Sequence, residues 1–182
     1  MFRLRNQENF KVPPMSRAAI RAAAYNVRAQ LGIADEKYID VARLLELILF
    51  QIPDFVDYDI VSPSDLGELE AATLVVGCGQ SKILIRDSVY DDLRKGLARP
   101  RFTVAHELGH AFLHSRLYGG PRDYVSNDWP AFRSSEWQAN EFGGELLAPA
   151  HLIQDITSVN EIAEQFGVST EVARRRLLNA VK

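Results

Sequence analysis

Residues 101–113 read RFTVAHELGHAFL and contain the pattern H-E-x-x-H as His106, Glu107 and His110. Apolar residues recur at helical spacing around this pattern, so the stretch is expected to form one largely buried helix. Two histidines four positions apart lie on one helical face, roughly 6 Å apart along the axis. Both imidazoles can therefore turn toward a single divalent ion, and a buried polar cluster of this kind requires such a partner.

The same pattern supplies a base for hydrolysis. Glu107 projects about 100° around the helix from His106, so we interpret it as the general base for an attacking water and not as a ligand. Gly109 is expected to leave space beside the metal. A chance occurrence of the pattern is the alternative, and it is disfavoured because the chain has only four histidines. The pattern indicates hydrolysis of a peptide bond by metal-activated water.

A catalytic zinc ion takes three protein ligands, so the third must come from outside the motif. The candidates are His114, His151 and the carboxylates that follow the motif. Eight residues of helix separate His114 from His106 by roughly 12 Å, which is too far for one tetrahedral ion. We therefore expect His114 at the helix end or behind a ligand.

The segment 134–149, SSEWQANEFGGELLAP, provides a better candidate. It is predicted to form a helix that is capped by one of its first two serines and ends before its proline. Glu136 and Asn140 share a face, so Glu136 can bind the metal while Asn140 holds the outer ring nitrogen of a ligand histidine. Glu141 and Glu145 have the same spacing, and we interpret them as exposed surface charges.

Composition limits the class of protein. The chain has 182 residues, of which 47% are hydrophobic and 25% charged, as in an ordinary soluble domain. A net charge of −3 disfavours nonspecific attraction to nucleic-acid phosphate or anionic lipid. The single cysteine, the absence of a signal-peptide pattern at the start and the lack of a long apolar run predict a cytoplasmic protein without membrane association.

Before the motif, the periodicity predicts two helices and then a small sheet. Ser16 and Asp40 are the predicted N-caps of helices over residues 17–31 and 41–52. Residues 55–86 change to a strand pattern, and the Gly-rich stretch GCGQS predicts a hairpin turn. We therefore expect an α+β fold with a small, mostly antiparallel sheet of about three strands packed on helices.

The end of the chain suggests a competing function. Residues 158–182 contain two short amphipathic helices joined by FGVS, with three consecutive arginines in the second, as in a DNA-binding helix-turn-helix. Direct DNA binding is disfavoured because the chain is acidic and few uncharged side chains are available to contact bases. We predict an irregular arm over residues 1–15, a metallopeptidase domain over residues 16–157, and the helical pair packed on that domain.

Three blocks together, RFTVAHELGH, EWQANEF and LLAP, resemble the ImmA/IrrE family of zinc metallopeptidases. The resemblance implies a zincin-type, gluzincin-like fold, in which the active-site helix lies beside a small sheet and precedes a ligand-bearing helix. It also implies one Zn²⁺ per chain, with Mn²⁺ as the alternative, and these roles: ligands His106, His110 and Glu136, and general base Glu107. Gly143 and Gly144 depart from the family pattern, and each weakens a helix by about 1 kcal/mol relative to alanine.

The resemblance further implies a substrate. Members of this family cleave helix-turn-helix repressors, often encoded nearby, and so release the repressed genes. The alternatives are a non-proteolytic toxin- or antitoxin-type partner of such a repressor, and a DNA-binding regulator. The resemblance transfers no oxyanion-stabilising residue. His114, Tyr118 and Tyr124 are the candidates for that role or for the cleft, which the loop over residues 116–133 is expected to line.

Overall fold

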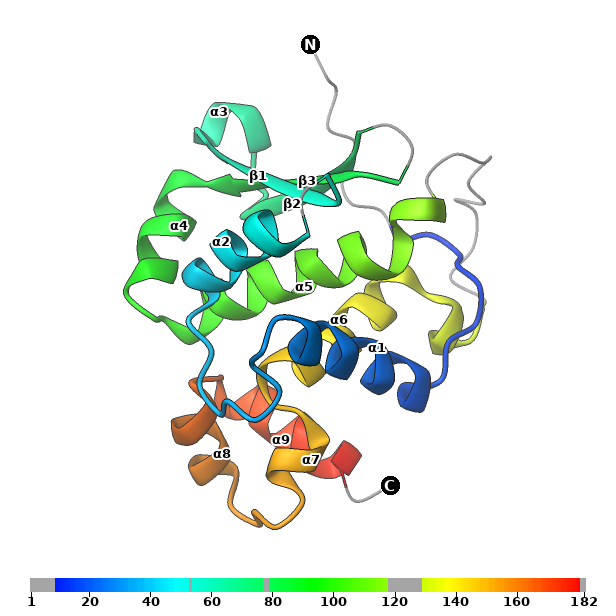
Figure 1. Ribbon diagram of the computed structural model, residues 1–182, viewed down its shortest axis with the longest axis vertical. Helices are drawn as coiled ribbons and strands as arrows, with labels where there is room; N and C mark the ends of the chain where they lie inside the picture. Colours follow the sequence, from blue (N-terminus) through cyan, green and yellow to red (C-terminus); the bar gives the residue numbers. More distant parts are fainter. Residues whose placement is uncertain (1–8, 53, 77–78, 118–128, 181–182) are drawn as a thin grey trace.

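The computed structural model describes residues 9–52, 54–76, 79–117 and 129–180. Figure 1 shows α5 crossing the molecule, with a three-stranded sheet on one side and α6 and α1 on the other, so the predicted α+β class is confirmed. Among the described helices, none has both the length and the apolar character that crossing a membrane requires. The elements are α1 (Arg17–Gln30), α2 (Val41–Gln51), β1 (Val56–Val61), α3 (Pro63–Leu66), β2 (Ala71–Val75), β3 (Ser81–Arg86), α4 (Asp87–Arg94), α5 (Ala98–His114), α6 (Ser135–Leu147), α7 (Ala150–Ile153), α8 (Val159–Phe166) and α9 (Thr170–Ala180), with short 3₁₀ turns η1 (Ser115–Leu117) and η2 (Ala131–Arg133).

The predicted helix starts are confirmed. Ser16 Oγ accepts a hydrogen bond from the backbone amide of Ala19, and the carboxylate of Asp40 accepts from the first amides of α2. At the start of α6, Ser134 Oγ accepts from the amide of Trp137. These side chains satisfy amides that have no partner within the helix, which is why the helices begin where the sequence predicts.

The sheet has the predicted three strands, in the order β1-β3-β2. β2 and β3 form the predicted antiparallel pair, whereas β1 pairs with β3 in parallel, so the sheet is mixed. β3 thus lies between the two strands that precede it in the sequence. Ile83 and Ile85 of this central strand are fully buried and belong to the main core.

Helices α5 and α6 pack backbone to backbone at two glycines. A Cβ atom at Gly109 would lie 2.9 Å from both Cα and the carbonyl oxygen of Ala139. A Cβ atom at Gly143 would lie 3.1 Å from the backbone nitrogen of His106. The prediction that Gly109 leaves space beside the metal is therefore wrong, since this glycine allows α6 to approach the motif helix.

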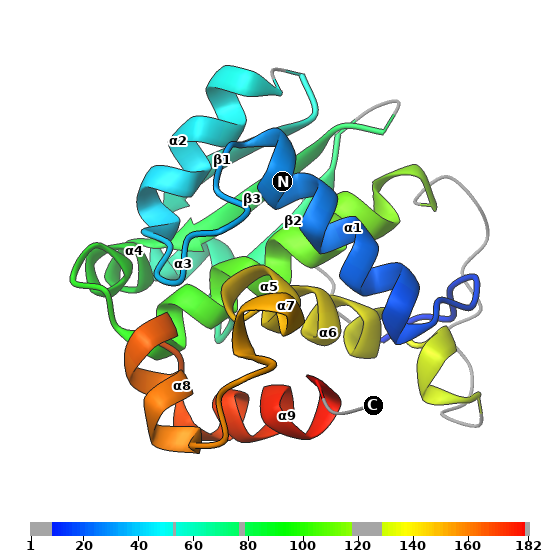
Figure 2. The same ribbon diagram turned by 60° about the horizontal axis from the view of Figure 1, so that its bottom comes forward.

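The C-terminal helical pair packs at the opposite end of the molecule from the sheet, with α9 beside α6 (Figure 2). Arg176 Nε donates to the backbone carbonyl of Ala148 at 2.8 Å, and Arg176 Nη2 lies 2.6 Å from Oε1 of Glu145. Glu145 is only 3% exposed, so its interpretation as a surface charge is wrong. It pairs with an arginine of α9, a contact between distant segments that helical spacing does not reveal.

The described part of the predicted arm is ordered against the start of α6. Lys11 forms a β-bridge with Ser134, and Val12 donates its amide to the carbonyl of Arg133. Phe10 and Val12 are buried. Residues 9–15, called the strap below, thus form no helix and only one isolated bridge, and they are held against η2 and the start of α6.

Candidate metal centre

Two elements bring three donor groups together. His106 and His110 lie on one face of α5, and Glu136 lies in the first turn of α6. The Nε2 atoms of the two histidines are 3.0 Å apart. Glu136 Oε2 lies 3.3 Å from His106 Nε2, and Glu136 Oε1 lies 3.0 Å from His110 Nε2. The three residues predicted as ligands therefore converge, with their donor atoms within 4.8 Å of one another.

This donor set fits a zinc ion. Ligand distances of 2.0–2.1 Å in a tetrahedral site place neighbouring donor atoms about 3.3 Å apart, close to the separations in this cluster. Two imidazole nitrogens and one carboxylate are also a donor set typical of catalytic zinc. Burial opposes ionisation of Glu136, but the neighbouring His106 and His110 outweigh burial and hold the pKa of this carboxyl well below its ordinary value. Glu136 is thus anionic at neutral pH, as a ligand must be.

Asn140 lies where the sequence places it, next to His106. Its Nδ2 donates to the backbone carbonyl of Glu136 at 2.8 Å, which leaves Oδ1 as the atom facing His106 Nδ1 at 3.2 Å. Since Oδ1 only accepts, His106 Nδ1 must carry the hydrogen. With this hydrogen on Nδ1, a neutral His106, the form that binds metal, directs the lone pair of Nε2 toward Glu136 and His110.

Glu107 is held from the sheet side. Its side chain is 2% exposed, and the hydroxyl of Thr73 on β2 lies 2.7 Å from Glu107 Oε2 and 3.0 Å from the Glu107 carbonyl oxygen. Thr73 was not predicted as a site residue. The residues of β2 read AATLV and do not alternate between polar and apolar, so the sequence does not indicate that Thr73 faces α5.

His114 lies behind His110. Its Nδ1 is 3.2 Å from His110 Nδ1, and its Nε2 is 3.0 Å from the side-chain oxygen of Gln138. Burial, together with the nearby His110, lowers the pKa of His114 to about 4. The ring has no exposed surface, so it lies behind the ligands, as predicted from distance, and not in a cleft.

The remaining candidates are not brought into the cluster. His151 lies on α7, is exposed, and its Nε2 is 3.2 Å from the carbonyl oxygen of Ala34. Tyr118 and Tyr124 lie outside the described residues, as does most of the predicted cleft loop. The structure therefore identifies no oxyanion-stabilising residue within the part of the chain that it describes.

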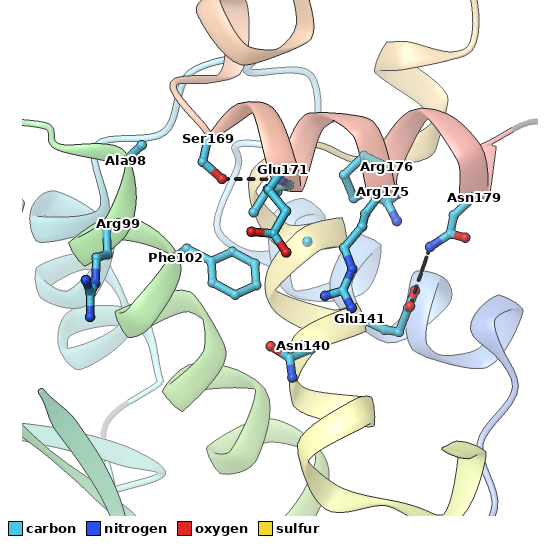
Figure 3. A pocket seen from close by; sticks show the side chains of 12 residues that line it. Ala98, Arg99, Phe102, Asn140, Glu141, Ser169, Glu171, Arg175, Arg176 and Asn179 are labelled. Atoms are coloured by element: carbon cyan, nitrogen blue, oxygen red, sulfur yellow. Dashed lines mark hydrogen bonds between the residues drawn. The ribbon is translucent and has the colours of Figure 1, made fainter. Parts of the chain in front are cut away.

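A cavity of about 450 Å³ adjoins the metal centre between α5, α6 and α9. Phe102 and Val172 are apolar parts of its lining, and Asn140 belongs to both the cavity and the metal centre. Figure 3 shows the side chains of Glu171 and Arg175 reaching from α9 into this cavity. Both of these side chains are exposed, so the cavity is open to solvent beside α9, whereas Ala173 and Arg176 are the buried residues of this helix.

One family model matches the region of the chain that contains this site. The model of the IrrE N-terminal-like domain, Peptidase_M78, matches residues 90–178. Among curated proteins, none is a significant match to the chain. The matched region runs from α4 into α9, so it includes the motif helix, the ligand-bearing helix and most of the C-terminal pair. The resemblance inferred from the motif blocks is confirmed.

Proposed function

Because the model of the IrrE N-terminal-like domain matches residues 90–178, we propose that this protein is a zinc-dependent endopeptidase that cleaves a helix-turn-helix repressor. The observation that carries the catalytic part is the convergence of His106, His110 and Glu136 on one point. The repressor as substrate is supported by the family resemblance. Cleavage of such a protein would release the genes that it represses.

His106 Nε2, His110 Nε2 and the Glu136 carboxylate would hold the metal. A bound Zn²⁺, or Mn²⁺ as the alternative, supplies Lewis acidity, which lowers the pKa of water to about 7 and polarises a peptide carbonyl. Glu136 comes from a different helix than the histidines, so the close packing of α5 on α6 determines the position of the third ligand.

Glu107 acts on protons. Its carboxylate takes a proton from the attacking water and delivers it to the nitrogen of the leaving amine. Thr73 orients this carboxylate through the 2.7 Å contact with Oε2. Since Glu107 is almost fully buried, the hydrogen bond restricts a side chain that bulk water does not screen.

The arrangement of α9 supports a peptidase over a DNA reader. In the arginine run, Arg174 and Arg175 are exposed, but Arg176 is buried against Glu145, and Arg175 lines the cavity beside α6. A recognition helix instead presents its polar side chains outward to the major groove. Arg176 thus uses its charge to hold α9 on α6 and is not available to nucleic acid.

The function is tested with the zinc-loaded protein and a helix-turn-helix repressor encoded by a neighbouring reading frame. Mass spectrometry should detect cleavage of the repressor at one site. Glu107→Gln should bind zinc and leave the repressor intact, while Glu164→Gln, an exposed change on α8, should cleave normally. Normal cleavage by Glu107→Gln would reject the assigned base. Tight binding without cleavage by the zinc-loaded wild type would instead indicate a non-proteolytic partner.

A further inference from the structure

The side-chain amide of Gln138 has a defined orientation. Its Nε2 donates to the backbone carbonyls of Pro13 and Phe132, both at 2.9 Å. The reversed amide would place an oxygen against both carbonyl oxygens. Gln138 Oε1 therefore faces His114 Nε2 at 3.0 Å, and because an amide oxygen only accepts, His114 Nε2 carries a hydrogen.

The next contact in this series of hydrogen bonds is between ring nitrogens of His114 and His110. Nδ1 of His114 and Nδ1 of His110 are 3.2 Å apart, so one proton lies between them. If His114 carried it, His114 would be a cation, and a neutral His110 would have its hydrogen on Nε2, the atom that faces Glu136. If His110 carries it, His114 is neutral and the lone pair of His110 Nε2 is available to a metal. Only the second arrangement is compatible with the metal centre.

We propose that Gln138 and His114 are positioning residues that set the tautomer of His110 and direct its Nε2 to the metal. The inference rests on the metal-dependent function proposed above. Both ligand histidines then carry their hydrogen on Nδ1. The side-chain oxygen of Asn140 accepts it from His106. His114 Nδ1 accepts it from His110, because Gln138 keeps the hydrogen of His114 on Nε2.

Burial keeps water away from this series of hydrogen bonds. His114 is 0% exposed and Gln138 is 1% exposed, so bulk water does not replace either partner. Phe10 packs edge-on against the His114 ring, with centroids 5.8 Å apart. Pro13 and Phe10 both belong to the strap over residues 9–15, which is thereby part of the support of the metal centre.

The first test measures zinc affinity by competition with a chelator. His114→Phe keeps a ring in the buried site but removes the acceptor for His110, and it should weaken zinc binding about 10- to 100-fold. His151→Phe, the same change at an exposed histidine of α7, should leave the affinity unchanged. Gln138→Leu should weaken binding in the same direction, with Gln165→Leu on α8 as its control.

The second test reads the tautomers directly. Ring ¹⁵N spectra of the zinc-loaded protein can be assigned because the chain has four histidines. We expect hydrogens on His110 Nδ1 and His114 Nε2 and none on His114 Nδ1. A hydrogen on His114 Nδ1, or wild-type zinc affinity in a folded His114→Phe variant, would overturn the inference and leave the peptidase proposal standing. A wild-type protein that binds no zinc would instead reject the proposed function. If His114→Phe does not fold, the wild-type spectrum decides.

Discussion

Gly109 of α5 lies against the backbone of Ala139 in α6, so closely that a Cβ atom at position 109 would be 2.9 Å from the Ala139 carbonyl oxygen. This contact sets the separation of the two helices that carry the proposed ligands. Three residues before Ala139, Glu136 reaches both histidines of the motif. The geometry of the metal centre thus depends on a position without a side chain.

Gly109→Ala should therefore force the helices apart. We expect a loss of about 1–3 kcal/mol in the free energy of unfolding, as for other overpacked cores, and weaker zinc binding. Gly143→Ala should cost less, because its Cβ contacts begin at 3.1 Å. Urea denaturation and zinc titration of both variants check this order. Unchanged stability in Gly109→Ala would contradict the close packing.

Thr73→Val should separate catalysis from metal binding. The substitution keeps the shape of the side chain but removes the hydroxyl that contacts Glu107 Oε2. Loss of a hydrogen bond to a charged group costs about 1.5–3 kcal/mol, so kcat should fall at least about tenfold. Zinc affinity should not change. Thr157→Val, at an exposed threonine, is the matched control, and equal kcat for both variants would refute the orienting role.

The buried His114 predicts a pH dependence of the metal-free protein. The pKa of His114 is lowered to about 4 in the folded state, so below its unfolded value of about 6.5 the unfolded chain binds the extra proton. Stability from this residue is therefore present at neutral pH and lost as pH falls. From about pH 7 to about pH 5 the loss should be about 2 kcal/mol.

That pH effect is measured as a difference between proteins. Chemical denaturation of metal-free wild type and His114→Phe at both pH values isolates the contribution of His114 from those of other groups. Wild type should lose more stability than the variant on acidification. Parallel losses in the two proteins would show that His114 titrates normally.

The sequence predicts the parts of this site that depend on local spacing. The motif helix, the capped ligand-bearing helix and the pairing of Glu136 with Asn140 follow from residues three to four positions apart. Contacts between distant segments were not predictable in the same way. Thr73 of β2 contacts Glu107 of α5, and the buried Glu145 pairs with Arg176 of α9. The parallel pairing of β1 with β3 likewise depends on tertiary contacts and not on local sequence.

The central claim is that Glu136 completes a metal centre with the two motif histidines, and zinc titration of Glu136→Ala tests it most directly. Wild type should bind one zinc per chain. Glu136→Ala should lose this tight binding while its circular dichroism spectrum stays that of the wild type, because the Glu136 side chain is 32% exposed and its removal leaves no buried cavity. Glu164→Ala, at an exposed position of α8, should bind zinc normally. Wild-type zinc stoichiometry and affinity in Glu136→Ala would contradict the account.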